Sequence, residues 1–404
     1  MLIIAGALSL LIWLYLFAAH GHFWRIGRIL AGKPAVLAAP ARIAVVIPAR
    51  DEVDVVGRAV TSLLNQGGGH SIQVFLVDDG SSDSTAQAAS EGAEKAGKSD
   101  MLTVIQGLAL VPGWSGKLWA IKQGVETARV LDPDFFLFTD ADIQHAPNSV
   151  ATLVAIAQAG GYDLASFMVR LECSTFAERM LIPAFVFFFL KLYPPAWVAD
   201  PRRTMAGAAG GSILIRPQAL ERAGGIDSIR GEVIDDCALA RQVKASGGKV
   251  WLGLTPETRS IRSYGSFVGI GRMISRGAFN QLHHSIWMLL LAVAGLTAAY
   301  LMPPLLVIFS HRMAPALLGA AAWLLMSCCF LPTVRFYRLF PLWATALPVI
   351  AIFYMGASVH SALRYWTGRG GQWKGRIQDP AHSPPTDKSG LSAAEAKDES
   401  GRHS

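Results

Sequence analysis

Alternating strand and helix patterns between residues 42 and 285 constrain the fold more than any other feature of this sequence. Ile43–Ile47 is a continuous apolar run that Pro48 ends, as expected for a strand buried on both faces. Residues 54–66 then show the helical spacing of apolar side chains. The pattern continues with predicted strands at 74–77, 101–105 and 135–139 and a predicted helix at 117–130. This order predicts an α/β domain with a mainly parallel sheet and ligand sites beyond the carboxyl ends of its strands.

Acidic residues follow three of these predicted strands, and they are Asp51, Glu52, Asp78, Asp79, Asp140 and Asp142. Because the carboxyl ends of parallel strands meet at one edge of a sheet, we expect these side chains to lie close together. In an extended segment, side chains two residues apart point to the same side, so Asp140 and Asp142 can converge on one hard cation. The alternative is a solvated turn at the end of a strand. Asp78 and Asp83 have ordinary uses in turns and helix caps, and we do not assign them to the site.

The composition indicates a membrane protein. Hydrophobic residues make up 52% of the chain and charged residues only 16%, below the quarter that is usual for soluble domains. The net charge of +7 does not indicate nucleic-acid binding, because the basic residues mostly flank apolar segments. Those residues are Arg25, Arg28, Lys33, Arg335, Arg338, Arg364, Arg369, Lys374 and Arg376. The four cysteines show neither metal-ligand spacing nor a disulfide framework.

Apolar segments lie at both ends of the predicted domain. Residues 1–19 are predicted to be a transmembrane anchor with the N-terminus outside and residue 25 onwards cytoplasmic. The C-terminal region, 286–363, contains apolar segments at 286–310, 314–334 and 341–363, each long enough to cross a bilayer. Three crossings would place the basic tail outside, against the tendency of basic residues to lie on the cytoplasmic side. If the Pro303–Pro304 segment is re-entrant, the number of crossings is even and the tail lies inside. The sequence therefore leaves two to three helices open. Residues 377–404 are polar and predicted to be disordered.

A further apolar stretch, 176–198, lies within the α/β region. Its uninterrupted run is short for a membrane span, and Lys191 and Tyr193 end it. An aromatic-rich helix lying in the membrane interface fits this pattern, and a buried core helix is the alternative.

Four spaced motifs resemble those of family 2 glycosyltransferases. They are Ile47–Glu52, Val77–Asp83, Asp140–Asp142 and Gly231–Asp236, the last with Leu239 three residues on. The resemblance covers about residues 42–285 and implies the GT-A fold, flanked here by N-terminal and C-terminal transmembrane helices. Three further stretches, 113–120, 272–282 and 371–376, are similar to the bacterial hopanoid-biosynthesis-associated glycosyltransferases, relatives of ceramide glucosyltransferase.

This resemblance implies a donor site for a nucleotide sugar, with UDP-sugars the expected donors. A divalent cation, Mg²⁺ or Mn²⁺, neutralises the departing diphosphate in such sites. By the family pattern Asp142 binds the metal, Asp140 reaches ribose or metal, Asp79 pairs with the nucleobase, and Glu52 (or Asp51) lies against the nucleoside. The expected nucleotide-sugar-binding residues are thus Pro48, Glu52, Asp79, Lys117, Asp140 and Arg276. Lys117 opens a helix after a Gly-rich loop, which suits a phosphate, although a solvated helix lysine is the alternative.

The second acidic pair, Asp235–Asp236, is predicted to be catalytic. Inverting transfer needs a general base to take the proton from the acceptor hydroxyl as it attacks the anomeric carbon. In the family the second acid of this motif does so, which points to Asp236. Asp235 stands where Glu is more usual, so the role of the first position stays open. The alternative is an acidic pair that stabilises a helix N-terminus.

The sequence thus predicts an inverting, metal-dependent transfer of a sugar to a membrane lipid, hopanoid-type or another lipid alcohol. The catalytic domain is expected on the cytoplasmic face of a bacterial inner membrane. The short loop before the 176–198 stretch and the loop 207–211 are expected to admit the acceptor. Alternatives are a polyprenyl-phosphate sugar transferase, a processive polysaccharide synthase and a non-catalytic nucleotide-binding scaffold. Residues 272–277 lack the Gln and Trp of the processive Gln-x-x-Arg-Trp motif, which favours a single transfer.

Overall fold

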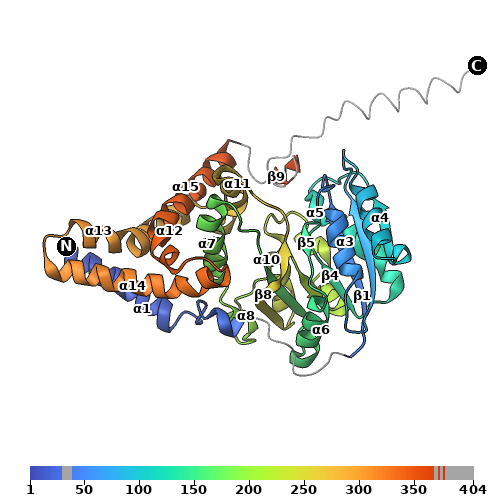
Figure 1. Cartoon of the computed structure of the whole chain (residues 1–404), viewed down its shortest axis with the longest axis horizontal. Coiled ribbons are helices and arrows are strands. Elements are labelled where there is room, and N and C mark those ends of the chain that lie inside the picture. The colour runs from blue at the N-terminus through green and yellow to red at the C-terminus, as the bar shows by residue number, and fades with distance from the viewer. Residues whose placement is uncertain (30–38, 368–371, 374–375, 378–404) are drawn as a thin grey trace, which may run out of the picture.

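The computed structural model places an α/β domain beside a bundle of apolar helices (Figure 1). It describes residues 1–29, 39–367, 372–373 and 376–377. The tail predicted to be disordered therefore lies outside the described residues, apart from Ile377.

An eight-stranded mixed sheet forms the centre of the α/β domain, in the order β3-β2-β1-β4-β7-β6-β8-β5. The strands are β1 (Arg42–Ala49), β2 (Ser71–Asp78), β3 (Leu102–Gln106), β4 (Phe135–Phe138), β5 (Ile143–Gln144), β6 (Leu164–Arg170), β7 (Ile213–Ile215) and β8 (Val250–Ser260). Strands β3, β2, β1 and β4 are mutually parallel, as are β6 and β8, whereas β7 runs antiparallel to its neighbours β4 and β6. The mainly parallel sheet predicted from the sequence is confirmed.

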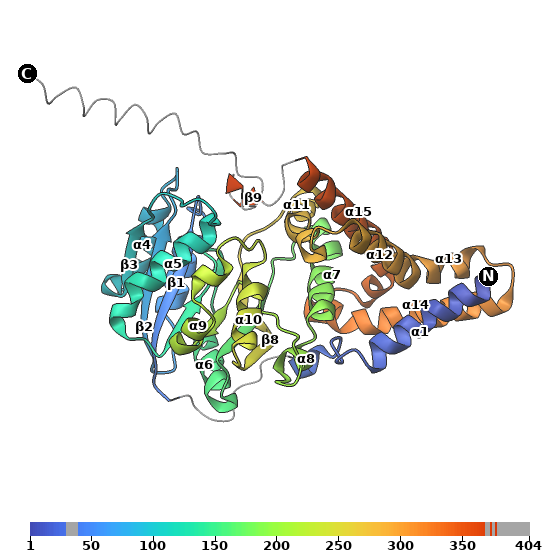
Figure 2. The same cartoon turned by 180° about the vertical axis from the view of Figure 1, so that it is seen from behind.

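Helices cover both faces of this sheet, because its strands are apolar on both sides. Ile43, Val45 and Ile47 of β1 face one cluster of buried side chains, while Ala44 and Val46 face another. The first cluster includes side chains of α3 (Val56–Leu64), α4 (Thr85–Lys95) and α6 (Ser149–Gly160). The second includes side chains of α5 (Gly116–Ala128), α9 (Pro217–Arg222) and α10 (Asp235–Ala245), which lie toward the viewer in Figure 2.

Strand β1 differs from its prediction in continuing through Pro48 to Ala49. Pairing with β2 extends to Ala49, but pairing with β4 ends at Val46. The carbonyl of Val46 accepts from Thr139 on the β4 side, and Pro48, two residues on, faces the same side. The missing N–H of Pro48 therefore falls where the ladder has already ended, and the proline costs no ladder hydrogen bond.

The apolar helices form a second packed body. They are α1 (Leu2–Ala18), the short α2 (Ile26–Ile29), α7 (Phe176–Leu192), α11 (Phe267–Gly277), α12 (Ile286–Leu296), α13 (Met302–Phe309), α14 (Met313–Phe336) and α15 (Leu347–Trp366). The short α8 (Pro195–Ala199) follows α7 and packs against β8 of the sheet instead. Four helical runs are long and apolar enough to cross a membrane, namely Phe176–Ala199, Ile286–Phe309, Met313–Phe336 and Pro341–Trp366. Helix α1, with 17 residues, is shorter than these. A small hairpin of β9 (Gln372–Trp373) and β10 (Arg376–Ile377) follows α15.

The Pro303–Pro304 pair lies inside a helical run rather than in a loop. Pro303 has no N–H, so the carbonyl of Ala299 loses its helical partner, and a π-helical turn at Thr297–Leu301 precedes the pair. Trp13 of α1 donates its indole N–H to that carbonyl at 2.7 Å. In an apolar environment a free carbonyl is costly, so this bond fixes α1 against the proline-containing helix.

Helix α7 joins the two bodies. Its buried side chains, among them Leu181, Ile182 and Phe187, pack with residues of α1, α14 and α15. At its start Glu178 is fully buried, and one carboxylate oxygen accepts hydrogen bonds from the N–H groups of Ser174 and Thr175 in a capping box. The other oxygen accepts from the Ser263 hydroxyl and the Tyr264 and Gly265 N–H groups of the β8–α11 loop. One carboxylate thus holds the start of α7 against the segment that follows β8.

We expect Glu178→Gln to destabilise the protein by about 3 kcal/mol, because the amide NH₂ would face backbone donors inside the fold. Thermal unfolding of the detergent-solubilised chain at a fixed scan rate measures the loss. Glu257→Gln, the same change at an exposed residue of β8, serves as control. Equal melting temperatures for the two variants would contradict this role of Glu178.

Candidate active site

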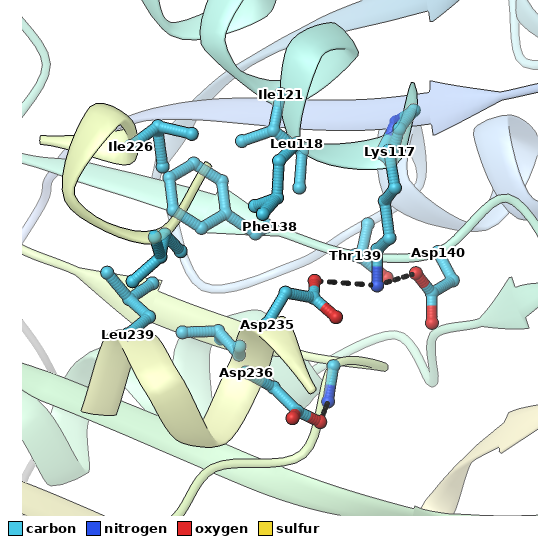
Figure 3. A pocket seen from close by; sticks show the side chains of 14 residues that line it. Lys117, Leu118, Ile121, Phe138, Thr139, Asp140, Ile226, Asp235, Asp236 and Leu239 are labelled. Carbon is cyan, nitrogen blue, oxygen red and sulfur yellow. Dashed lines mark hydrogen bonds and ion pairs between the residues drawn. The ribbon is translucent and has the colours of Figure 1, made fainter. Parts of the chain in front are cut away.

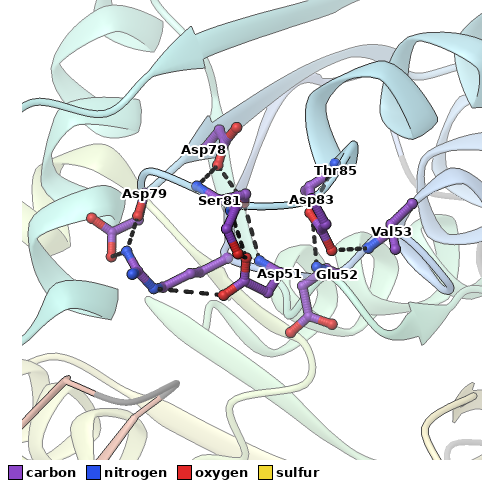
Figure 4. A network of polar contacts seen from close by, with 10 residues as sticks. Asp51, Glu52, Val53, Asp78, Asp79, Ser81, Asp83 and Thr85 are labelled. Carbon is purple, nitrogen blue, oxygen red and sulfur yellow. Dashed lines mark hydrogen bonds and ion pairs between the residues drawn. The ribbon is translucent and has the colours of Figure 1, made fainter.

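Two loops at the carboxyl edge of the sheet are fastened to each other by short polar side chains (Figure 4). Asp51 has a left-handed backbone with φ of 51°, and its carboxylate accepts from the N–H and hydroxyl of Ser82. Asp78 accepts from the N–H of Ser81, and Asp83 accepts from the N–H groups of Val53 and Thr85. Asp51 and Asp83 thus hold the β1–α3 and β2–α4 loops together, and Asp78 stabilises the turn within the β2–α4 loop.

Arg50 joins Asp79 to this network, because it also pairs with Asp51, whereas the Glu52 carboxylate points out of the network. The Asp79 side chain is 3% exposed, and its Oδ2 lies 3.8 Å from Nη1 of Arg50. In Figure 4 the Glu52 carboxylate points away from the hydrogen-bonded loops. The backbone N–H of Glu52, in contrast, donates to the Thr85 hydroxyl oxygen at 2.8 Å. The loops thus present Glu52 rather than Asp51 to the space beyond the strands.

Arg262 occupies the region between Glu52 and Asp142. Its Nη2 pairs with Glu52 Oε2, and its Nε lies 3.2 Å from Asp142 Oδ2. The Ser260 hydroxyl, at the end of β8, donates to the same Asp142 oxygen at 2.9 Å. Arg262 was not predicted from the sequence, because it follows β8, a strand that was not among the predicted ones.

Lys117 joins the first acidic pair to the second (Figure 3). Its ammonium lies 2.9 Å from Asp140 Oδ1 and 3.1 Å from Asp235 Oδ2. The Ser115 N–H donates to the Arg230 carbonyl, which ties the start of α5 to the chain that enters α10. Burial opposes the charge on Lys117, but the carboxylates of Asp140, Asp235 and Asp236 outweigh it and raise its pKa. Lys117 is therefore a bridging cation and not a solvated helix lysine.

Asp236 lies at the base of the same cavity with both carboxylate oxygens engaged by backbone N–H groups. Oδ1 accepts from Cys237 at 2.7 Å and Oδ2 from Gly210 at 2.8 Å. Burial and the charge of Asp235 nevertheless raise the pKa of Asp236 to about 6, against the opposing effect of Lys117. Burial also raises the pKa of Asp140, again opposed by Lys117. The carboxyl of Asp236 has an affinity for protons that suits a general base near neutral pH.

Gly210 lies where the charged groups converge. A Cβ at this position would lie 3.3 Å from Lys117 Nζ, 3.5 Å from Asp236 Oδ2 and 3.8 Å from Asp140 Oδ2. The neighbouring Gly211 carbonyl accepts from Thr139 at 2.8 Å, which fixes this loop to the end of β4. The cavity encloses only about 20 Å³, room for little more than one water molecule. A larger ligand requires Lys117 and Asp235 to separate.

Asp140 and Asp142 offer carboxylate oxygens, the kind of ligand that Mg²⁺ and Mn²⁺ take. Among the described residues, Asp140 Oδ2 and Asp142 Oδ1 make no hydrogen bond or ion pair, which leaves one oxygen on each for a metal. No group of three or more His, Cys, Asp or Glu side chains converges within the described chain. Two carboxylates completed by water and substrate phosphate are nevertheless a common arrangement for Mg²⁺.

The structure brings together most of the residues singled out from sequence. Pro48, Lys117, Asp140, Asp235 and Asp236 line the cavity. Glu52 and Asp142 meet on Arg262, and Asp79 lies one strand away beside Arg50.

Arg276 lies apart from these acids. It is exposed near the end of α11, and no hydrogen bond or ion pair joins it to any of them within the described residues. Arg276 and Asp142 both influence the side chain of Tyr264. Burial and Asp142 raise the pKa of Tyr264 to about 12, and Arg276 opposes that rise.

Comparisons with known proteins give a match to one sequence family and a likeness to solved structures. Residues 44–222 match the sequence model of glycosyl transferase family 2. This match ends before Asp235 and Asp236. No curated protein sequence matches the chain.

Two solved structures are among those that match, and the first of them supports the likeness of fold. A mannosyltransferase from Pyrobaculum calidifontis, in complex with GDP-Man and Mn²⁺, is 17% identical with a TM-score of 0.52, covering 88% of this chain and 98% of its own. A glucosyl-3-phosphoglycerate synthase from Mycobacterium tuberculosis, in complex with Mn²⁺, UDP and glucosyl-3-phosphoglycerate, is 20% identical with a TM-score of 0.39, covering 64% and 84%. The chain has the GT-A fold.

We expect Lys117→Met to destabilise the protein in a pH-dependent way. Without the ammonium, the folded-state pKa values of Asp140 and Asp236 rise further above 3.8, the ordinary value. A carboxyl whose folded-state pKa is raised costs stability as the pH climbs from the unfolded-state to the folded-state value. The loss should therefore be small near pH 4 and reach about 2 kcal/mol near pH 7, less than for a fully buried pair because the site is partly exposed.

Melting temperatures across this pH range, with EDTA present, test the expectation. Lys122→Met on the same helix removes the surface pair with Asp227 and should cost below about 1 kcal/mol. A loss for Lys117→Met that is constant with pH would mean that Lys117 contributes packing rather than charge.

Proposed function

We propose that this protein, a glycosyltransferase with a family 2 domain at residues 44–222, transfers a sugar from a nucleotide-sugar donor to a membrane lipid alcohol. The proposed reaction inverts the anomeric centre, requires a divalent cation and takes place on the cytoplasmic face of a bacterial inner membrane. A hopanoid-type lipid is the proposed acceptor class, on the resemblance noted in the sequence, and a UDP-sugar is the proposed donor.

One observation carries the proposal. Asp140 shares a single cavity with Asp235 and Asp236, which lie far from it in the sequence, and Lys117 bridges Asp140 to Asp235 (Figure 3). Asp140 comes from the carboxyl end of β4, and Asp235 and Asp236 from the start of α10. A transferase needs donor-binding and proton-accepting groups on either side of one anomeric carbon, and this arrangement supplies both.

Asp236 is the proposed general base. Its carboxylate takes the proton from the acceptor hydroxyl as that oxygen forms a bond to the anomeric carbon, and the nucleoside diphosphate leaves with the electron pair of the broken bond. The N–H groups of Cys237 and Gly210 fix the orientation of the carboxylate. A raised pKa keeps it a competent base at neutral pH without loss of its ionised form.

Asp140, Asp142 and Lys117 form the proposed donor side. A divalent cation bound there would neutralise charge on the departing diphosphate. Lys117 stands in the first turn of α5, where a cation and the helix N-terminus both favour phosphate. Donor binding would draw Lys117 from Asp235 and Arg262 from Asp142, which frees the acids for their roles.

The path from the apolar helices to the cavity supports a lipid acceptor. Helix α7, one of the candidate spans, ends at Tyr193, against which Gly207 packs so closely that a Cβ there would lie 2.8 Å from the ring. Three residues on, Gly210 reaches the cavity and binds Asp236. The loop 207–211 thus runs from the helical body to the proposed base, where an acceptor hydroxyl is needed.

Replacement of Asp236 by Asn should lower kcat by about 10²–10⁴-fold, since general-base catalysis contributes that much. Donor binding should stay within about twofold, because the donor side is unaltered. Transfer of label from a panel of UDP-sugars and GDP-sugars into lipid, with purified protein in bilayers, measures turnover, and calorimetry with UDP measures binding. The exposed Asp227→Asn is the control. Normal turnover by Asp236→Asn would refute the assignment of the base.

Removal of divalent cations with EDTA should stop transfer, and Mn²⁺ or Mg²⁺ should restore it. Asp142→Asn should require at least about tenfold more Mn²⁺ for half-maximal rate, because a charged oxygen ligand is lost. Asp132→Asn, at a side chain 91% exposed, should titrate like wild type. Full activity in EDTA would contradict metal-dependent transfer.

A further inference from the structure

A groove between α11 and α15 lies outside the cavity described above. The two helices lie side by side in both views of the molecule (Figure 1 and Figure 2). The groove has a volume of about 860 Å³, within the range of small-molecule sites. Residues of both helices line it, and the basic side chains among them are Arg272 of α11 and His360 and Arg364 of α15.

Its two ends differ in chemistry because the two helices run in the same direction. The Phe267 and Phe353 rings lie 6.0 Å apart, and farther along the Ser361 hydroxyl binds the Ser275 carbonyl. The beginnings of the helices therefore form an apolar end with Phe267, Val268 and Phe353. Toward the later turns lie Arg272, His360 and Arg364, which form the basic end.

Among the described residues, the basic end has no acid paired with its arginines, Arg272 and Arg364. Arg364 lies in the last turn of α15, a helix that belongs to the candidate span Pro341–Trp366. Trp366, 53% exposed, marks the same level, since Trp and Arg side chains gather where bilayer meets water.

Small residues keep the groove open. A Cβ on Gly356 would meet no atom within 4 Å, and one on Gly271 would only touch the Phe353 ring at 3.4 Å. With Ala357 they form a floor without bulky side chains. Such a floor leaves room for a chain-like apolar ligand between the helices.

From this arrangement we propose that the α11–α15 groove binds a bilayer phospholipid with an anionic headgroup. An acyl chain lies along Phe267, Val268 and Phe353, and the headgroup phosphate is held by Arg272, His360 and Arg364. The charge complementarity selects an anionic headgroup, and the apolar end selects a lipid over a soluble phosphate. The site is separate from the sugar-transfer cavity and does not depend on the proposed reaction.

The test measures bound lipid rather than activity. The full chain is equilibrated in nanodiscs of phosphatidylcholine with phosphatidylglycerol, and lipids retained after transfer to mild detergent are counted by native mass spectrometry. Wild-type protein should retain phosphatidylglycerol in preference to phosphatidylcholine. Arg272→Gln with Arg364→Gln should lower this preference more than about tenfold, since each basic residue near the surface contributes about fivefold. Arg312→Gln, an exposed arginine between α13 and α14, should leave it unchanged.

A second variant tests the shape of the groove. Gly356→Leu fills the floor and should abolish retention of phosphatidylglycerol. Gly295→Leu on α12, where a Cβ likewise meets nothing within 4 Å, should retain it. Equal retention of both lipids by wild-type protein, or unchanged preference in the double arginine variant, would overturn the proposal, and neither result depends on whether Gly356→Leu folds.

Discussion

Charge balance at one edge of the sheet is the constraint on which the rest of this structure depends. Six acids gather there, namely Glu52, Asp79, Asp140, Asp142, Asp235 and Asp236, and they would repel one another strongly at such distances in a partly buried site. Arg50, Lys117 and Arg262 lie among them, and each contacts at least one of these acids. The fold tolerates the acids because it supplies internal cations at the same place.

Under the proposed function, the same cations would also allow an anionic donor to bind among these acids. Lys117 and Arg262 hold carboxylates that a metal and a diphosphate would engage, so binding exchanges one set of ionic contacts for another. The acids at this edge would then be balanced by positive charge both before and after the ligands bind. The position of Arg262 is set in turn by the β8–α11 loop, which Glu178 fixes to the start of α7. The β8–α11 loop therefore links the helical body to the acidic edge of the sheet, both along the chain and through its hydrogen bonds to Glu178.

Regular patterns made much of the fold predictable. The apolar run of β1, the acids that follow β1, β2 and β4, and the helical spacing of α3 and α5 each reflect a local rule. That the acids lie near one another then follows from one principle, namely that the carboxyl ends of parallel strands meet at a common edge of the sheet. The extension of β1 through Pro48 escaped that approach, because it depends on where the β4 ladder ends. Similarly, Trp13 meets the carbonyl that Pro303 leaves free across a long separation in sequence, and no local pattern encodes that pairing.

The sequence by itself determined the α/β order, the apolar helices and which acids follow strands, because these depend on neighbours within a few residues along the chain. Only the tertiary structure decided which cations those acids meet. It placed Lys117 between Asp140 and Asp235, brought Arg262 onto Glu52 and Asp142, and left Arg276 apart on α11. It also decided that Gly210, from a loop after α8, binds Asp236. Long-range contacts of this kind depend on how whole helices pack against the sheet, and no spacing in the sequence specifies them.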